Sequence, residues 1–394
     1  MHLILFTHPE FSASKSMQLY AQLIETGMAK RGHTVTLITA KPFFYRIQVA
    51  GLAKWLGYLD QFIIFPIYFK FKKSRLPKNS MYVFTDHALG PWVPLVISKP
   101  HVVHCHDFIA QKSALAELDE NKLSRTGIWY QQLIRKGYSK AKNFISISQA
   151  TQTDLHRFLK EKPCISEVVY NGLNQDFKTG NTAEVRNYLT TKYQTDLRQG
   201  YIFHIGSNAF YKNREGVLAI YDSWRRQSQL QLPLILVGEK PNDVLNNLLE
   251  QSPYAADIYF LTGVGDADLQ AFYQGARLLL FPSLEEGFGW PIAEAQACGC
   301  PVVTTAKAPM TEVGGDAAFY IPRLDKKKDS EELWASQAAV VVESITCLTD
   351  ADLQAIQEAG LENARRFNTE KSLDAVEHIY KNIYEQYAQK HGLV

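Results

Sequence analysis

The sequence predicts an α/β protein with two domains, each built on a parallel sheet. Its 394 residues are too many for one ordinary core and suit two domains of similar size. A βαβ pattern opens the chain, with strands expected at 2–7 and 34–39 around an amphipathic helix at 14–31. A strand begins again at 201–206 and a helix follows it. This restart indicates a second domain.

Composition restricts the function. A hydrophobic content of 46% with evenly spread charge is typical of a globular enzyme, and a net charge of +2 does not favour nucleic acid. Five cysteines without a disulfide-framework spacing fit a reducing cytoplasm. The apolar start of the chain is too short for a signal peptide, and no run reaches the roughly 20 apolar residues that span a bilayer.

A histidine-rich strand is expected at 101–106, directly before Asp107. Alternate strand residues share a face, so His104 and His106 should point the same way. His106 and Asp107 fall at the carboxyl end of the strand, where α/β sheets keep their ligand sites. Two alternatives to a ligand-binding role remain: a zinc site formed by His104, His106 and Asp107, or a buried histidine with a structural role.

Residues 41–75 are basic and aromatic, with seven Lys or Arg against the single acid Asp60. This composition is typical of a surface that sits on anionic lipid. The alternative is a buried helix and strand with a few solvated lysines. Nucleic-acid binding is a third reading, which the nearly neutral chain disfavours.

Residues 278–305 contain the most informative pattern. The apolar run 278–281 predicts a buried strand, and Gly287 and Gly289 allow positive φ and close approach of a ligand to the main chain. Pro291 and Gly299 predict a helix from Pro291 to Cys298. The unpaired N–H groups at its start can bind a phosphate.

Two acids flank this turn. Glu286 lies on the loop and Glu294 a turn into the helix. A carboxylate repels phosphate but accepts hydrogen bonds from a vicinal diol, so one acid can hold a sugar ring and the other a ribose. Lys212 is expected at the start of a helix, where a cation is unfavourable unless an anion binds there. These residues together predict a site for a sugar diphosphate.

The following residues resemble the donor-site signature of glycosyltransferase family four, a group of retaining enzymes with the two-domain GT-B fold: Glu286-Gly287-Phe288-Gly289, Glu294 eight residues further on, and Ala297-Cys298-Gly299-Cys300-Pro301-Val302-Val303. The resemblance implies two Rossmann-like domains facing a central cleft. Residues 168–173 resemble the last strand of the family's first domain and the Asn-Gly turn that follows it, which places the domain boundary near Asn174. The resemblance thus implies domains at 1–174 and 175–374, and a C-terminal helix at about 375–394 that packs back on the first domain.

The resemblance assigns further roles. It implies that His106 approaches the donor sugar, that Glu286 holds the sugar hydroxyls and Glu294 the ribose, and that Lys212 takes the diphosphate. Ser207 and Asn208 stand where relatives usually have an arginine, so Arg214 is a candidate substitute. The remaining donor-side residues are Gly206, Ser207, Thr262, Gly263, Val264, Gly287, Phe288 and Gly289, and those on the acceptor side are Ser14, Lys15 and Asp107.

The implied function is retaining, hexosyltransferase-type transfer from a nucleotide diphosphate sugar to the hydroxyl of a sugar or lipid-linked acceptor. It needs no cofactor and no metal, and serves cell-surface polysaccharide or glycolipid assembly in the cytoplasm or at the inner face of the membrane. Asp266-Ala267-Asp268 is explained by N-capping from Asp266 rather than by a metal. A sugar-nucleotide epimerase of the same fold and a non-catalytic nucleotide-binding partner are alternatives. An NAD oxidoreductase is disfavoured because no Gly-x-Gly-x-x-Gly follows a first strand.

Overall fold

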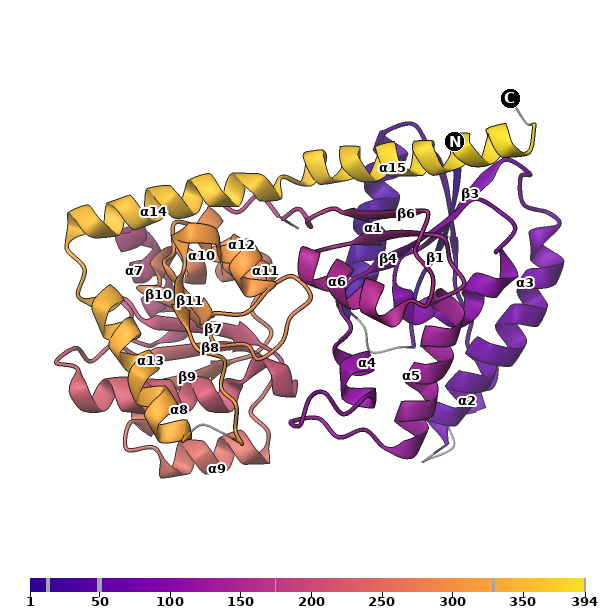
Figure 1. The fold of residues 1–394 in the computed structure, drawn as a ribbon. Helices are drawn as coiled ribbons and strands as arrows, with labels where there is room; N and C mark the ends of the chain where they lie inside the picture. Colours follow the sequence, from indigo (N-terminus) through magenta and orange to yellow (C-terminus); the bar gives the residue numbers. More distant parts are fainter. Residues whose placement is uncertain (12–14, 48–51, 174, 328–329, 393–394) are drawn as a thin grey trace. The chain divides into compact units, whose positions relative to one another are not determined.

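A computed structural model describes residues 1–11, 15–47, 52–173, 175–327 and 330–392 of the chain (Figure 1). The chain forms two compact units. Unit 1 comprises Met1–Asn174 and Thr369–Val394, and unit 2 comprises Gln175–Asn368. The long C-terminal helix therefore belongs to unit 1 although it follows unit 2 in the sequence.

The sheet of unit 1 has six parallel strands in the order β2-β1-β3-β4-β5-β6. Its strands are β1 (His2–Phe6), β2 (Thr34–Ile38), β3 (Ser80–Phe84), β4 (His101–Cys105), β5 (Asn143–Ser146) and β6 (Ile165–Val168). Its α-helices are α1 (Lys15–Lys30), α2 (Ala53–Leu59), α3 (Phe65–Lys73), α4 (Ile109–Ala114), α5 (Arg125–Tyr138), α6 (Gln149–Phe158) and α15 (Thr369–Lys390).

Helices cover both faces of this sheet, which explains why its strands are almost wholly apolar. Each face of the sheet has its own hydrophobic core, and alternate residues of β1 point into one core or the other. Leu3 packs with α1 and α15, whereas Ile4 packs with α3, α5 and α6. The last strand was expected near residues 168–173 but lies at Ile165–Val168, because its register with β5 starts at Ile165 opposite Asn143.

The segment 41–75 contains no strand among its described residues, contrary to one sequence-based alternative. It forms α2 and α3, joined by a π-helical turn at Asp60–Ile64. One side of this helical segment is buried, since Phe65 and Phe69 pack against Phe6 of β1 at 6.3 and 5.2 Å between ring centroids.

Unit 2 also has six parallel strands, in the order β12-β11-β10-β7-β8-β9. They are β7 (Ile202–Gly206), β8 (Leu234–Gly238), β9 (Ile258–Leu261), β10 (Leu278–Phe281), β11 (Val302–Thr305) and β12 (Phe319–Ile321). The α-helices are α7 (Thr182–Tyr193), α8 (Arg214–Gln227), α9 (Asp243–Gln251), α10 (Asp266–Gly275), α11 (Trp290–Ala297), α12 (Met310–Gly314), α13 (Glu331–Thr346) and α14 (Asp350–Ala364).

The two faces of the unit 2 sheet are again covered by helices. Leu234 and Leu278 pack with α8 and α13 on one face, while Phe203 contacts Phe272 of α10 on the other. Successive residues of a strand face opposite sides, so the inner strands β7, β8, β10 and β11 are buried on both faces, whereas the edge strands β9 and β12 are partly exposed.

The expected N-cap of α10 was wrong. Gly265 occupies the N-cap position without a side-chain bond, and Asp266 lies within the first turn. Asp268 binds Lys192 of α7 at 2.7 Å and accepts hydrogen bonds from Tyr188 and Tyr193. Asp268 therefore joins α10 to α7 through its side chain.

Among the described residues, no helix combines the length and the apolar character needed to cross a membrane.

Candidate functional site

The order of the strands creates a switch point in unit 2. The chain runs from β7 through β8 to β9 in one direction, and β10, β11 and β12 lie on the other side of β7. Ligands of open α/β sheets bind beyond the carboxyl ends of the strands at such a point. The loops after β7 and β10 are therefore the first place to look for a site.

Lys212 lies in the loop after β7. It ends a 3-10 turn, Phe210–Lys212, and Asn213 then caps α8, so Lys212 precedes the helix instead of starting it. The left-handed φ of +52° at Asn213 turns the chain, and the Asn213 side chain donates to Pro282 O at the end of β10. This contact holds the loop after β7 against the loop after β10.

Glu286 in the second loop pairs with Lys212. Lys212 Nζ lies 2.7 Å from Glu286 Oε1, and both side chains are largely buried. The adjacent acid Glu285 has a different role, because it is buried and binds Lys307. Only the second acid of the Glu-Glu pair therefore meets the predicted diphosphate lysine.

The turn after Glu286 has the expected glycine geometry at one of its two glycines. Gly289 has φ +101° and occupies the N-cap of α11, while Gly299 has φ +74° just beyond the helix end. The side chain of Phe288 is buried against Trp290 and Phe367. Any ligand contact from Phe288 is thus restricted to its main chain.

Glu294 lies inside α11 and is almost fully buried. Burial raises the pKa of Glu294 to about 7, against the lowering effects of the hydrogen bond from Tyr273 and the charge of Lys212. Tyr273 OH donates to Glu294 Oε2 at 2.7 Å. The structure thus brings Lys212, Glu286 and Glu294 into one electrostatic environment, and Tyr273 is a member that the sequence did not reveal.

Arg214 is buried at the start of α8, directly after the loop that follows β7. Its Nη1 donates to Asn208 Oδ1 and to Glu239 O, and its guanidinium lies over the ring of Phe260. Within the described part of the chain, its Nε and Nη2 have no hydrogen-bond partner. These contacts tie Arg214 to the loop after β8, whereas Lys212 contacts the loop after β10.

The other predicted donor-side residues are more dispersed. Gly206 ends β7, and a Cβ added there would lie 3.4 Å from the Lys212 side chain, so this glycine allows close packing. Ser207 accepts from Ala209 N at 3.4 Å. Thr262, Gly263 and Val264 follow β9, which β8 separates from β7, placing them about 10 Å to the side.

His106 follows β4 in unit 1 and is 3% exposed. Its Nε2 lies 2.8 Å from Thr85 O and must donate, since a carbonyl only accepts. Burial lowers the pKa of His106, so the ring is neutral and Nδ1 carries a lone pair. Nδ1 has no partner in the part of the chain that the structure describes. It can accept a hydrogen bond from a hydroxyl.

The acceptor-side predictions are less well defined. Asp107 is half-buried, and its Oδ1 accepts a hydrogen bond from Ile109 N at 3.0 Å, just before α4. Ser14 lies outside the described residues, as does the side chain of Lys15. His104, part of the alternative zinc site, is bound instead by Tyr20 and Tyr380.

Known protein families match both units of the chain. The sequence family described as Glycosyltransferase Family 4 matches residues 17–177, and the family described as Glycosyl transferases group 1 matches residues 188–333. The chain belongs to glycosyltransferase family four. Its two parallel six-stranded sheets with flanking helices constitute the GT-B fold.

The family-four chain is 29% identical over 256 residues to the O-antigen chain mannosyltransferase B of Escherichia coli, which covers 64% of each chain. It is 24% identical over 293 residues to the D-inositol 3-phosphate glycosyltransferase of Corynebacterium aurimucosum, covering 71% of this chain and 66% of the relative. Both matches span less than two thirds of the relative. HepE of Anabaena, solved with UDP and glucose, covers all of both chains with a TM-score of 0.66 and 16% identity.

An acid–histidine pair in unit 1 was not recognised from the sequence. His8 follows β1 and Asp86 follows β3, the two strands at the switch point of this sheet, and His8 Nε2 lies 2.7 Å from Asp86 Oδ2. Burial acts to raise the pKa of Asp86, but His87 and His8 lower it well below its usual value. The available signal was the position of both residues directly after adjacent strands.

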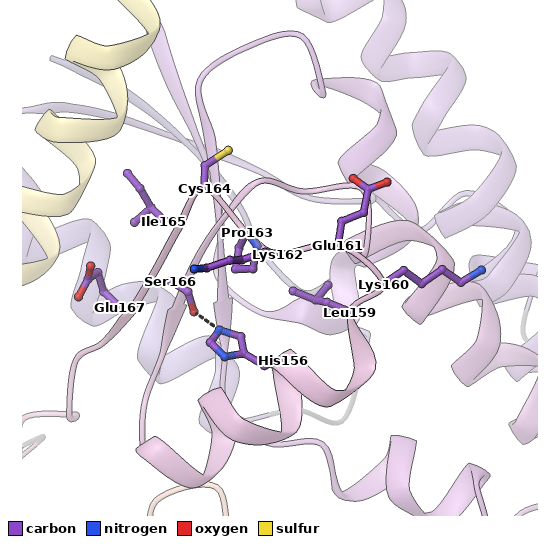
Figure 2. Close-up of a pocket in the computed structure, with 10 residues that line it drawn as sticks. All are labelled: His156, Leu159, Lys160, Glu161, Lys162, Pro163, Cys164, Ile165, Ser166 and Glu167. Atoms are coloured by element: carbon purple, nitrogen blue, oxygen red, sulfur yellow. Dashed lines mark hydrogen bonds between the residues drawn. The ribbon is translucent and has the colours of Figure 1, made fainter.

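A cavity at the β6 edge of the unit 1 sheet contains none of the predicted site residues (Figure 2). It surrounds the loop that leads into β6, where Ser166 Oγ lies 2.8 Å from His156 Nε2. Its lining residues are His156, Leu159, Lys160, Glu161, Lys162, Pro163, Cys164, Ile165, Ser166 and Glu167. Because these residues lie at the start of a strand, the cavity is separate from the site residues at the strand ends.

No group of three or more His, Cys, Asp or Glu with the geometry of a metal site occurs within the described ranges. All five cysteines are free thiols, and Cys298 and Cys300 are buried in unit 2, as expected for small core residues.

Proposed function

We propose that this family-four chain transfers a sugar from a nucleotide diphosphate sugar to an acceptor hydroxyl, with retention at the anomeric carbon. One observation carries the proposal: a lysine, two carboxylates and the start of α11 gather around the switch point of unit 2. Lys212 and Glu286 are in direct contact, and Lys212 also lowers the pKa of Glu294.

The cationic part of this group suits the leaving diphosphate. Cleavage of the anomeric bond places negative charge on the diphosphate, and a preorganised donor stabilises that charge most in the transition state. Lys212 is the proposed donor, together with the N–H groups after Gly289 at the start of α11. Arg214 supports the loop after β7 through Asn208 and Glu239, and we propose a supporting electrostatic role for it.

The two carboxylates suit the hydroxyls of the same donor. Glu286 Oε1 holds Lys212, which leaves the second carboxylate oxygen available to a sugar hydroxyl. One carboxylate oxygen of Glu294 accepts the hydrogen bond from Tyr273, and we propose that the other oxygen binds the ribose. Main-chain groups of Thr262 and Gly263 are proposed to frame the base.

His106 is the proposed contact to the transferred sugar from unit 1. Its neutral ring offers Nδ1 as an acceptor, which a sugar hydroxyl can satisfy. In this role His106 positions the sugar and moves no proton.

The proposed chemistry is attack from the same face, with a leaving phosphate oxygen accepting the proton of the acceptor hydroxyl. No cofactor and no metal is required in this scheme, because Lys212 and the N–H groups at α11 stabilise the leaving group. Ser14, Lys15 and Asp107 remain the proposed contacts to the acceptor.

The proposed setting is cell-surface polysaccharide or glycolipid assembly in the cytoplasm. The name of the Escherichia coli relative, an O-antigen chain mannosyltransferase, supports a hexose donor and a polysaccharide product. We also propose contact between residues 41–75 and the inner face of the membrane, since lipid-linked acceptors lie there.

The test begins with nucleotide sugars, including UDP-glucose and GDP-mannose, in a thermal-shift panel. A ligand at 100 times its dissociation constant stabilises the protein by about 2.7 kcal/mol. The stabilising sugar nucleotide is then incubated with acceptor oligosaccharides, and NMR of the product reports the anomeric configuration. An inverted product, or stabilisation by NAD and by no nucleotide sugar, would contradict the proposal.

A further inference from the structure

An apolar stripe lies on the outer side of the α2–α3 segment. Five apolar side chains at every fourth position are all exposed: Trp55 (46%), Leu59 (38%), Ile63 (51%), Ile67 (51%) and Phe71 (75%). Large apolar side chains on a soluble surface are usually scattered singly. A regular row of five along one helical segment therefore indicates a contact surface.

The π-helical turn keeps this row together. In a regular α-helix, residues four apart rotate by about 40° per step, so five of them would spread around much of the helix. The turn at Asp60–Ile64 has more residues per turn and rotates less per residue, which offsets the drift in the middle of the row. The sequence spacing and the local geometry thus act together.

The stripe cannot turn inward to bury itself in unit 1, because the other side of the same helical segment is already packed. Phe65 and Phe69 are fully buried against the sheet, and Tyr58 contacts Tyr130 of α5 at 5.0 Å between ring centroids. The segment is therefore apolar on both sides, and among the described residues of unit 1 only its inner side has a packing partner.

The charge around the stripe is positive. Residues 41–78 contain eight Lys or Arg and one acid. That acid, Asp60, is fully buried and accepts hydrogen bonds from the N–H groups of Phe43, Phe44 and Tyr45. It fastens the preceding loop to the helix and contributes no negative charge to the exposed surface.

The basic side chains gather at the C-terminal end of the stripe. Lys70, Arg75 and Lys78 are exposed, while Lys72 lies over the ring of Tyr68. Lys73 differs, because its ammonium donates to Leu95 O and is engaged inside unit 1. A second copy of the chain on this face would bring two positive rims together, whereas an anionic lipid surface complements both the charge and the apolar row.

We propose that the stripe formed by Trp55, Leu59, Ile63, Ile67 and Phe71 inserts into the interfacial region of an anionic membrane while Lys70, Lys72 and Arg75 bind lipid phosphates. This inference rests on the membrane contact proposed above and is independent of the transfer reaction. It defines which side chains enter the lipid and which remain at the headgroups.

The full chain is tested by co-sedimentation with vesicles of phosphatidylcholine alone and of two parts phosphatidylcholine to one part phosphatidylglycerol. The stripe variant combines Ile63→Ser, Ile67→Ser and Phe71→Ser. Its matched control replaces three similarly exposed apolar residues elsewhere, Leu19→Ser, Leu333→Ser and Val340→Ser. The charge variant combines Lys70→Gln, Lys72→Gln and Arg75→Gln.

We expect binding to the anionic vesicles that weakens with salt and falls about 100-fold in the charge variant. The stripe variant should lose at least tenfold on the same vesicles, and the matched control should bind like the unchanged chain. Brominated acyl chains should quench tryptophan fluorescence less in Trp55→Phe. Circular dichroism and the thermal shift with nucleotide report whether each variant is folded.

Different failures are distinguishable. Anionic vesicle binding that the stripe variant retains would overturn the assigned surface and leave the proposed membrane contact standing. Failure of the unchanged chain to bind any vesicle would overturn both, while its nucleotide binding tests the transfer function separately. If light scattering shows that the unchanged chain is a dimer and that the stripe variant is a monomer, then a second copy of the chain, not lipid, covers the stripe.

Discussion

Lys212 Nζ and Glu286 Oε1 lie 2.7 Å apart across the two loops that follow β7 and β10. The two residues are 74 positions apart in the sequence, and the parallel pairing of β7 with β10 brings their loops together. Both side chains are mostly buried, so this ion pair is less screened than one on the surface. In the proposed donor complex, the diphosphate would take over part of the lysine's coordination and free Glu286 for a sugar hydroxyl.

The first prediction concerns the charge of Lys212. Lys212→Ala should weaken binding of the nucleoside diphosphate about 10- to 150-fold, the usual effect of losing one charged hydrogen-bond donor. Lys212→Arg should recover part of the loss. Isothermal calorimetry measures the dissociation constants, and Lys192→Ala is the control because Lys192 forms a similar 2.7 Å ion pair with Asp268 in the same unit. Equal losses in the Lys212 and Lys192 variants would show that the effect is not local.

The second prediction concerns the buried acid Glu294. Its pKa is raised to about 7 in the folded chain from an ordinary value of 4.5, so the folded chain holds more protons than the unfolded chain between these pH values. Its contribution to stability is therefore present below pH 4.5 and is lost as the pH rises to about 7. Glu294→Gln should be more stable relative to the unchanged chain at pH 8 than at pH 5, by about 2–3 kcal/mol.

Urea unfolding at both pH values measures this difference. Glu331→Gln, at an exposed position of α13 in the same unit, is the matched control for the same chemical change. Glu294→Gln should also weaken nucleotide binding, since a diol prefers the two-oxygen acceptor of a carboxylate. A constant difference in unfolding free energy across the pH range would contradict the assignment of this group.

Local rules made much of this site predictable from the sequence. Glycine at the end of a helix, proline near its start and a short apolar run before a loop each act over a few residues. Gly289, Gly299 and the bounds of α11 therefore followed the expectation closely. The hydrogen bond between Tyr273 and Glu294 depends on how α10 and α11 pack, and no rule of sequence spacing predicts such a contact.

The same reason explains the errors. Asp266 is a good N-cap residue by propensity, but Gly265 is the N-cap of α10 and Asp266 lies inside the first turn. Lys192 of α7 binds Asp268 instead. The basic and aromatic composition of 41–75 indicated a surface but not its geometry. The π-helical turn and the burial of Asp60 became visible only in the structure.

The third prediction concerns the C-terminal helix of unit 1. His104 lies between two tyrosines, with Tyr20 OH 2.8 Å from Nδ1 and Tyr380 OH 2.7 Å from Nε2. Tyr380→Phe leaves a buried ring nitrogen without its partner and should cost about 1–3 kcal/mol of unfolding free energy. Tyr384→Phe, one turn further along α15 and only partly buried, should cost much less. Urea unfolding and hydrogen exchange of the α15 amides measure both effects, and equal costs would refute the role of the His104 bond.

The fourth prediction concerns Asp60. Asp60→Ala removes the acceptor of three main-chain N–H groups in a fully buried position and should cost about 2–4 kcal/mol. The loss should appear first as faster hydrogen exchange at residues 43–45, because their N–H groups are released. Asp176→Ala is a control at an exposed aspartate. Unchanged exchange at 43–45 would show that the loop is held by other contacts.

The last prediction separates the sugar from the nucleotide. The neutral ring of His106 keeps Nδ1 as an unpaired acceptor, while Nε2 is held by Thr85 O. His106→Phe keeps an aromatic ring beside Tyr20, whose ring centroid lies 4.4 Å away, but removes the Nδ1 acceptor and also the hydrogen bond from Nε2 to Thr85 O. Binding of the nucleotide sugar should weaken about fivefold to tenfold, as expected for one hydrogen bond, whereas binding of the nucleoside diphosphate alone should not change. Calorimetry with both ligands gives the two ratios, and an equal loss for both ligands would mean that His106 supports the fold and does not contact the sugar.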